Sequence, residues 1–317
     1  DMGLCQACCG SGDGGKTHEI ETSLNMTVTG KRRALLVGIN YVGSRAELRG
    51  CINDVNNQRD VLIEHYGFKP EDIQMINEDQ PKDKWPYKSA ILAGLKSLYE
   101  GAQHGDLLVF QYSGHGSQFE DETGLHDCIC PLDCLDKPWP DAVILDSEIH
   151  SAFYAPLPSG CMAVALFDCC HSGTVAQLVV KRDVNQKAEF QPKARYMEPP
   201  EHLAPKAPAG IAGIRRRVMS EELGDHKLWV FSGCQDDQTS ADAYEDGMYQ
   251  GAFTWSMTSA LSQHGYMLRY GETLSCARAL LQGKYSQRPA LSTTAEANFD
   301  RYFLGKRPDA AAKAPQA

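Results

Sequence analysis

The chain has 317 residues, 42% of them hydrophobic, which is enough for a substantial buried core. Its formal net charge of −10 argues against a nucleic-acid partner, which would require a basic face to displace counterions from phosphate. No apolar run approaches the roughly 20 residues of a membrane-spanning helix, so the sequence predicts a soluble, cytoplasmic globular protein. A chain of this length needs no disulfide framework, and most of its 12 cysteines are expected to be buried free thiols.

Residues 1–30 show little periodicity and are predicted to form a flexible leader. If translation begins one residue before Gly3, that glycine is a candidate for myristoylation, and Cys5, Cys8 and Cys9 are candidates for palmitoylation. Two such signals would attach the protein to a membrane. A zinc site is the alternative, because Cys5 and Cys8 have CxxC spacing, although no second ligand pair follows.

From Ala34 onward, apolar strands alternate with amphipathic helices, a pattern that builds a parallel sheet through right-handed crossovers. Strands are expected at residues 34–39, 73–76, 106–112, 161–167 and 227–231, and near Ala290. Helices are expected at residues 53–65, 87–100, 251–263 and 272–282, the first of them ended by Gly67. We therefore predict an α/β fold with a mostly parallel central sheet flanked by helices.

The sequence divides into two structured regions joined by a linker. Residues 31–180 are predicted to be the catalytic region, and residues 226–305 are predicted to complete the same sheet. Between them, residues 181–225 contain prolines at 192, 199, 200, 205 and 208, and nine Lys or Arg against four acids up to Arg217. This composition is typical of a solvated linker. The tail at residues 306–317, rich in Ala, Pro and Lys, is expected to be disordered.

His115 and Cys170 each follow an apolar run that ends where a parallel strand should end. Because the carboxyl ends of parallel strands meet at one edge of a sheet, we expect imidazole and thiol to come together there. A nearby imidazolium or helix N-terminus would lower the pKa of the thiol and make Cys170 a nucleophile. His171 is less suited as the base, since adjacent residues seldom face each other. The N–H groups of Cys170 and Gly116 are candidate donors to an oxyanion.

The motifs around these two residues, at residues 112–116 and 168–173, resemble those of the metacaspases, which are cysteine peptidases of the caspase fold. The likeness covers roughly residues 32–304. It extends to further blocks at residues 50–54, 232–242, 251–254 and 287–292. The resemblance implies the caspase-hemoglobinase fold, with a p20-like region, a linker and a p10-like region in the order of type I metacaspases.

The resemblance further implies cleavage after Arg or Lys, with Asp54 and Asp168 lining the pocket for the residue before the cut, and Cys51 and Ser113 beside them. Two carboxylates in a cleft can bind a guanidinium through charge-assisted bonds and would repel an acidic side chain. For Asp54, an alternative role is that of a helix N-cap just after Gly50.

Such a pocket makes the basic residues of the linker candidates for self-cleavage. They are Lys181, Arg182, Lys187, Lys193, Arg195, Lys206 and Arg215 to Arg217. We hypothesise processing within residues 181–217. The alternative is that these residues only form a solvated basic surface.

The resemblance also implies calcium as an activator rather than a catalytic group, bound by hard carboxylate oxygens. Asp127 and Asp146 match family ligand positions, and Glu148 is a third candidate. Ser147 and Gln177 stand where the family often has acids, so the affinity should be weaker. A nearby acidic cluster offers compensation: Glu120, Asp121 and Glu122. Without metal, this acidic loop is expected to be a solvated turn.

We therefore predict a cysteine endopeptidase acting on protein or peptide substrates with Arg or Lys before the cut, and the family implies a monomer. One alternative is a non-catalytic caspase-fold scaffold that binds partner proteins. Another is a redox sensor using the neighbouring thiols of Cys169 and Cys170. We expect Cys169 to point away from Cys170 and to serve as a buried packing residue.

Overall fold

The structure is a computed structural model that describes residues 28–122, 124–170, 192–203, 227–234, 238–293 and 298–305. The candidate acylation sites, Gly3, Cys5, Cys8 and Cys9, lie outside these residues, as do His171 and Gln177. Among the residues that are described, every helix is too short or too polar to cross a lipid bilayer. The nine cysteines in this part of the chain are free thiols, and all except Cys276 are buried.

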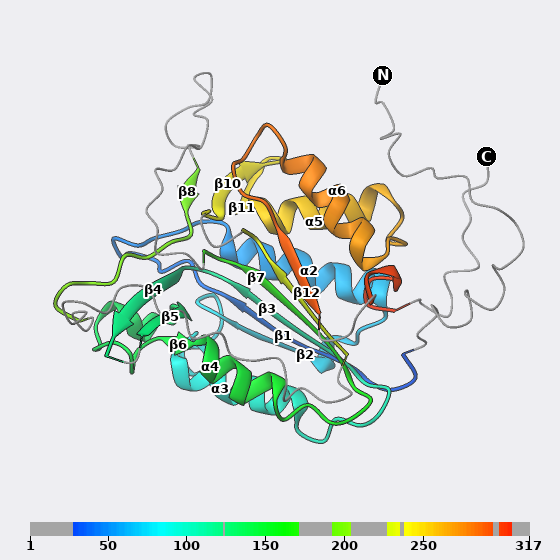
Figure 1. Ribbon diagram of the computed structural model, residues 1–317, viewed down its shortest axis with the longest axis horizontal. Coiled ribbons are helices and arrows are strands. Elements are labelled where there is room, and N and C mark those ends of the chain that lie inside the picture. Colours follow the sequence, from blue (N-terminus) through cyan, green and yellow to red (C-terminus); the bar gives the residue numbers. More distant parts are fainter. Residues whose placement is uncertain are drawn as a thin grey trace, which may run out of the picture.

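A six-stranded sheet forms the centre of the molecule, in the order β12-β9-β7-β3-β1-β2 (Figure 1). Its strands are β1 (Arg32–Gly38), β2 (Ile73–Asn77), β3 (Leu107–Ser113), β7 (Met162–Asp168), β9 (Lys227–Ser232) and β12 (Ala290–Thr293). All neighbouring strands pair in parallel except β12, which runs antiparallel to β9. The predicted mostly parallel α/β sheet is confirmed, and strands from both sides of the expected linker share it.

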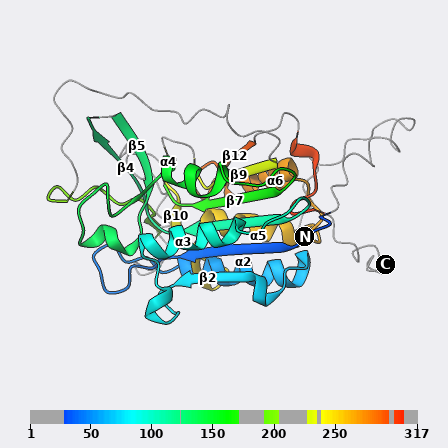
Figure 2. The same ribbon diagram turned by 90° about the horizontal axis from the view of Figure 1, so that it is seen from below.

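Helices cover both faces of this sheet (Figures 1 and 2). One face carries α2 (Cys51–Tyr66), α5 (Ala252–Gln263) and α6 (Tyr270–Leu281), and the other carries α3 (Lys88–Tyr99) and α4 (Asp146–Ile149), which a π turn over His150–Tyr154 continues. Side chains of a strand alternate between faces, so Leu35 and Val37 of β1 join one core while Ala34 and Leu36 join the other. Burial on both faces explains why the strands read as continuous apolar runs.

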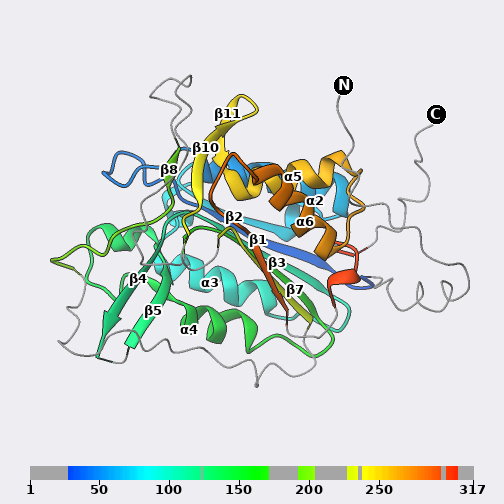
Figure 3. The ribbon, with the colours of Figure 1, turned by 45° about the horizontal axis from the view of Figure 1, so that its top comes forward.

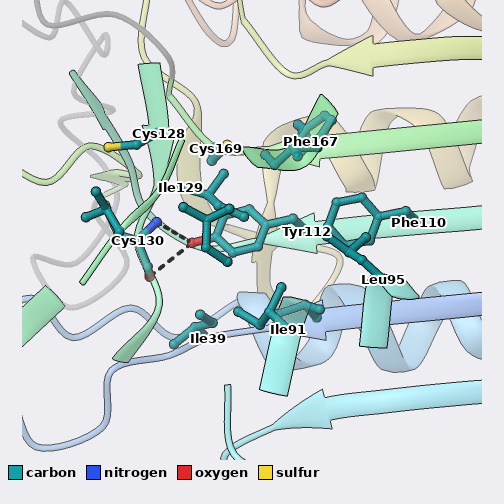
Figure 4. Packing of buried hydrophobic residues seen from close by; sticks show 14 of the residues in the cluster. Ile39, Ile91, Leu95, Phe110, Tyr112, Cys128, Ile129, Cys130, Phe167 and Cys169 are labelled. Carbon is teal, nitrogen blue, oxygen red and sulfur yellow. Dashed lines mark hydrogen bonds between the residues drawn. The ribbon is translucent and has the colours of Figure 1, made fainter. Parts of the chain in front are cut away.

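The hydrophobic cluster between α3 and the central sheet includes the last residues of β3. Ile91 and Leu95, one helical turn apart, pack beside Phe110 and Tyr112 (Figure 4). The Tyr112 hydroxyl accepts the Cys130 N–H at 3.2 Å and lies 2.8 Å from the His115 carbonyl oxygen, to which it donates. This buried network fixes the chain that follows β3.

Cys169 belongs to the same hydrophobic cluster and is completely buried (Figure 4). Burial raises the pKa of its thiol well above the usual value. A redox-sensing thiol is normally accessible and has a low pKa, so this environment suits the packing role expected for Cys169 rather than a sensor.

Two small antiparallel sheets, absent from the sequence prediction, stand at the carboxyl end of the central sheet (Figure 3). One contains β4 (Gly116–Asp121), β5 (Gly124–Ile129) and β6 (Ile144–Leu145), and the other contains β8 (Lys193–Ala194), β10 (Ala241–Glu245) and β11 (Met248–Gly251). The acidic loop expected as a solvated turn is therefore mostly β4 and β5. These strands are short and half-polar, which gives them no apolar run for a sequence reading to detect.

The expected solvated linker also differs in its described part, residues 192–203. Arg195 there is completely buried. Arg195 forms ion pairs with acidic residues of other elements. The composition of the segment alone does not predict these pairs.

Candidate active site

The pairing of β3 with β7 determines where His115 and Cys170 lie. The last pair in the register is Ser113 with Asp168, so each candidate residue follows two positions beyond the end of its strand. Gly116 packs against the backbone of Cys170 so closely that a Cβ on this glycine would lie 1.6 Å from the Cys170 carbonyl oxygen. The two strand ends therefore meet, and only glycine fits beside the cysteine.

Hydrogen bonds determine which nitrogen of His115 is able to act as a base. Its Nε2 lies 2.8 Å from the Ala46 carbonyl oxygen, which can only accept, so Nε2 carries the proton. In the neutral ring the lone pair then resides on Nδ1, which is buried and makes no hydrogen bond to the described residues. The backbone is held as well, because the His115 N–H donates to the Tyr41 hydroxyl at 3.0 Å. Burial lowers the pKa of His115 to about 4.

The thiol of Cys170 is fully enclosed. Its Sγ accepts the Ser240 N–H at 2.9 Å. Burial raises the pKa of this thiol well above its usual value. The sequence led us to expect a thiolate beside an imidazolium, but burial of both groups favours a neutral thiol and a neutral imidazole in this state. The helix N-terminus expected after Cys170 lies outside the described residues.

Residues 192–203 pass beside the dyad, because the Arg195 carbonyl oxygen accepts the Cys170 N–H. Within this segment, β8 lies next to β10 as an added strand (Figure 3). Ala194 and Lys193 of β8 pair antiparallel with Ala241 and Asp242 of β10. The next N–H, that of Arg195, donates to the Ser240 carbonyl oxygen at 2.8 Å. This is the β-augmentation by which extended peptides bind to a strand edge.

The Arg195 carbonyl oxygen is the meeting point of the two predicted oxyanion donors. It accepts the Gly116 N–H at 3.0 Å and the Cys170 N–H at 3.2 Å. Two N–H groups converging on one carbonyl oxygen beside a thiol form the arrangement that stabilises the oxyanion of acyl transfer. The site is therefore able to polarise a peptide bond held at this position.

The Arg195 side chain fills a pocket of three buried carboxylates. Its Nη1 lies 2.7 Å from Asp54 Oδ2 and 3.3 Å from Asp168 Oδ2, and its Nη2 lies 2.9 Å from Asp242 Oδ1. Burial alone would lower the pKa of Arg195, but Asp168, Asp54 and Asp242 raise it well above the usual value. The pocket holds three carboxylates and one cation. Burial raises the pKa of Asp54 to about 7, because the repulsion from Asp168 adds to the effect of burial and the attraction of Arg195 offsets only part of it.

The first two of these carboxylates are held in place by further hydrogen bonds. Asp168 accepts the Ser240 hydroxyl at 2.5 Å, the Thr254 N–H at 2.8 Å and the Thr254 hydroxyl at 2.7 Å. Asp54 accepts the Gly251 N–H at 2.8 Å. A pocket with prearranged acceptors of this kind favours a guanidinium or an ammonium group over a neutral side chain.

The alternative role for Asp54 as an N-cap is wrong. Gly50 occupies the N-cap position of α2, and Asn40 Oδ1 instead accepts the Cys51 N–H at 3.0 Å. Asp54 lies in the first turn with its side chain in the pocket. Cys51 is buried near the same acids, and burial raises the pKa of its thiol. Ser113 is buried at the end of β3.

Asp242 is the pocket residue that sequence reasoning missed, although it lies in the block at residues 232–242 that carried the family resemblance. It also accepts the Arg49 N–H at 2.9 Å and the Gly50 N–H at 3.0 Å, which ties β10 to the start of α2. Asp242 does not follow an apolar run, whereas the predicted site residues His115 and Cys170 do. Its partner Arg195, whose Nη2 lies 2.9 Å from Asp242 Oδ1, is 47 residues away in the chain, so no local pattern in the sequence connects the two.

The predicted calcium ligands lie on β5 and at the start of α4. Cys128 pairs with Leu145 across β5 and β6, and Asp127 and Asp146 are the chain neighbours of this last pair. Glu148 is engaged elsewhere, because Lys88 Nζ lies 2.9 Å from its Oε1 and the Leu145 N–H donates to it at 3.0 Å. Within the part of the chain that is described, no group of three or more His, Cys, Asp or Glu side chains is arranged to hold a metal ion.

A mostly parallel central sheet flanked by helices, with a cysteine and a histidine at adjacent strand ends, is the arrangement of a caspase-fold cysteine peptidase. The model of the family described as "Metacaspase, peptidase C14 domain" matches residues 32–179. The chain is 37% identical over 303 residues to Metacaspase-1 of Kluyveromyces lactis, covering 87% of this chain and 69% of that protein. It therefore belongs to the metacaspases, a family of cysteine-type endopeptidases.

Two further comparisons agree with this family and fold. Metacaspase-1 of Cryptococcus neoformans is 37% identical over 293 residues, covering 84% of this chain, which spans 63% of that protein's length. The crystal structure of caspase-1 from Spodoptera frugiperda superposes with a TM-score of 0.55 over 90% of this chain and 94% of that chain. At 13% sequence identity, this likeness shows the fold alone.

Proposed function

We propose that this chain is an endopeptidase that cleaves after Arg or Lys, with Cys170 as the nucleophile and His115 as the base. Arg195 carries the proposal, because its carbonyl oxygen receives the Gly116 and Cys170 N–H groups while its guanidinium fills the acidic pocket. These are the contacts that a substrate residue before the cut would need in the transition state. An aspartate in this pocket would meet like charges, so acidic residues are excluded.

In the proposed reaction, Nδ1 of His115 takes the proton of the Cys170 thiol, and the sulfur attacks the carbonyl carbon. The two N–H groups stabilise the charge that develops on the oxygen. Collapse breaks the C–N bond, and the imidazolium gives its proton to the leaving amine. A water molecule, deprotonated by His115, then hydrolyses the thioester, releases the carboxylic acid and restores the thiol.

We extend this proposal to self-processing at the bond between Arg195 and Tyr196, which the same contacts support. Of the basic residues at 181–217, Lys193 and Arg195 lie in the described part of the chain. Lys193 is exposed, and its Nζ bonds to the Glu47 carbonyl oxygen at 3.0 Å, outside the acidic pocket. Arg195 is thus the residue of this pair that is presented for cleavage, and the neutral dyad keeps the bond intact until the site is activated.

For activation, we propose calcium binding at Asp127 and Asp146, which adjoin the paired residues Cys128 and Leu145 in the chain. Two carboxylates supply fewer than the six to eight oxygens that calcium takes, so backbone carbonyls or water would complete the shell. Glu148 would have to leave Lys88 to take part. The ion would supply charge compensation at this loop and no step of the hydrolysis.

The test is an assay of fluorogenic peptides ending in Arg, Lys or Asp, with calcium or with a chelator, on the full chain. We expect hydrolysis of the Arg and Lys peptides and none of the Asp peptide. Cys170→Ala and His115→Ala should each lower kcat/KM by about 10³-fold or more. Retained hydrolysis in Cys170→Ala would overturn the proposed nucleophile, and equal rates with the chelator would remove calcium.

Mass spectrometry of the incubated protein tests the self-cleavage site. A new fragment should begin at Tyr196, and Arg195→Gln should abolish it while Arg195→Lys retains it. An active enzyme that stays one intact chain under the same conditions would contradict self-processing.

A further inference from the structure

The chain does not end its contacts at Arg195, and the residues after it are also held against the enzyme. Tyr196 forms a parallel bridge with Gly116. The Met197 N–H donates to the Gly116 carbonyl oxygen at 3.0 Å, and the Ser117 hydroxyl donates to the Met197 carbonyl oxygen at 2.6 Å. The backbone at Met197 is therefore fixed through both its N–H and its C=O by the first two residues of β4.

The Met197 side chain enters the hydrophobic core. Only 8% of the residue is exposed, and it belongs to the cluster under α3 and β3. Its Sδ lies 3.4 Å from the Cys134 Sγ, in the turn at Leu132–Leu135. A sulfur-lined apolar position suits a flexible, unbranched apolar side chain and offers no partner to a carboxylate.

Burial along this segment alternates in the way of an extended chain. Arg195 and Met197 are buried, Tyr196 between them is half-buried, and Glu198 after them is exposed. Side chains two residues apart in a strand point to the same side. Arg195 and Met197 are thus two positions apart on one side of the extended chain, and the proposed scissile bond lies between them.

Beyond Glu198 the segment is less enclosed. Glu198, Glu201 and His202 line an open cleft of about 690 Å³, which also reaches Met197, Cys134 and His115. A second anchor follows where the Trp139 N–H donates to the Leu203 carbonyl oxygen at 2.7 Å. Of Tyr196, Met197 and Glu198, only Met197 is buried.

We propose that the Met197 position is a substrate subsite on the leaving-group side, selecting an unbranched apolar residue at the second position after the cut. This inference rests on the proposed function and narrows its substrate class to proteins with a basic residue before the cut and an apolar residue at the second position after it. The Ser117 hydroxyl and the Gly116 carbonyl hold the substrate backbone there, and Cys134 forms part of the floor under its side chain.

The experiment uses internally quenched peptides that copy residues 192–199, with Met, Gly or Glu at the position of Met197, and the full chain as enzyme. We expect kcat/KM for the Met peptide to exceed that for the Gly and Glu peptides by roughly 10- to 100-fold. A fluorophore amide that ends at Arg, and so lacks residues after the cut, is measured in parallel. Equal rates for the three peptides, with the amide still hydrolysed, would overturn the subsite and leave the proposed function standing.

A hydroxyl deletion tests the backbone contact independently of the side chain. Ser117→Ala should lower the ratio of kcat/KM for the Met peptide to kcat/KM for the Arg amide several-fold, because only the peptide has a carbonyl for Ser117. Ser275→Ala, at an exposed position of α6, is the matched control and should leave this ratio unchanged. An unchanged ratio in Ser117→Ala would count against the subsite, and failure to hydrolyse any Arg substrate would overturn both proposals.

Discussion

Residues 192–203 contact both the acidic pocket and the His115–Cys170 dyad, yet burial acts on the two in opposite ways. In the pocket, Arg195 supplies a guanidinium that pairs with three carboxylates, so charges persist inside the molecule. At the dyad no matched opposite charge is supplied, and burial lowers the pKa of the imidazole and raises that of the thiol. The binding half of the site is therefore charged and complete, whereas the reactive half is neutral.

The largest effect that would sharpen this contrast is expected from Asp242→Asn. Asp242 pairs with Nη2 of a guanidinium, whereas the single ammonium of lysine cannot occupy the Nη1 and Nη2 positions together. We expect kcat/KM to fall by about 10²-fold for Arg peptides, from the loss of a buried charge pair, and by less for Lys peptides. Steady-state kinetics on matched Arg and Lys peptides measures the change in their ratio.

The control is Asp60→Asn, whose carboxylate is half-exposed and pairs with Arg59 on the surface. That variant should leave the Arg-to-Lys ratio unchanged. Equal losses for both peptides in Asp242→Asn would mean that the residue only supports the fold.

A smaller effect is expected when the segment is released by Arg195→Gln. Without the guanidinium the segment should leave the pocket, water should reach the dyad, and the pKa of Cys170 should fall toward its ordinary value. Each unit of that fall gives about tenfold more thiolate at neutral pH. Iodoacetamide should therefore modify Cys170 at least about tenfold faster, as followed by peptide mass mapping.

Arg195→Lys keeps a positive charge for the pocket and serves as the matched variant, with a rate close to that of the parent chain. Thermal melts of both variants establish that they are folded, since an unfolded chain would expose every thiol. A folded Arg195→Gln variant with an unchanged rate at Cys170 would break the link between the segment and the neutral dyad.

A third test concerns the dependence of folding stability on pH. Burial lowers the pKa of His115 to about 4, against about 6.5 in an unfolded chain. Between these pH values His115 binds fewer protons in the folded chain than in the unfolded chain. Its contribution to the free energy of unfolding is therefore fully present above pH ~6.5 and is lost as the pH falls through about 4. The loss amounts to about 3 kcal/mol, and His115→Gln should remove it from the pH dependence of urea unfolding.

The exposed residue His104 provides the comparison, because His104→Gln leaves the buried imidazole in place. This variant should follow the parent chain between pH 4 and pH 7. An identical pH slope in His115→Gln and the parent would show that the imidazole is not held neutral by burial.

Strands were predicted from apolar runs in the sequence, and site residues were sought directly after them. This criterion succeeded for strands that are buried on both faces of the sheet, because such strands are apolar throughout. It placed β1, β3 and β7, and the parallel register then brings the residues after β3 and β7 to one edge. It failed for β4, β5 and β10, whose polar residues are matched across short antiparallel pairs that a linear reading cannot align. Asp242 was missed for this reason, and Arg195 was not singled out because its burial depends on acids far away in the chain.

The pairing of β7 with β9 has a consequence for what happens after a cut behind Arg195. The broken bond lies in the connection between these two strands, and their six paired positions from Met162 to Phe167 stay joined. The products would thus be two polypeptides sharing one sheet. A denaturing gel would resolve them as separate bands, whereas gel filtration would return a single species of the original size.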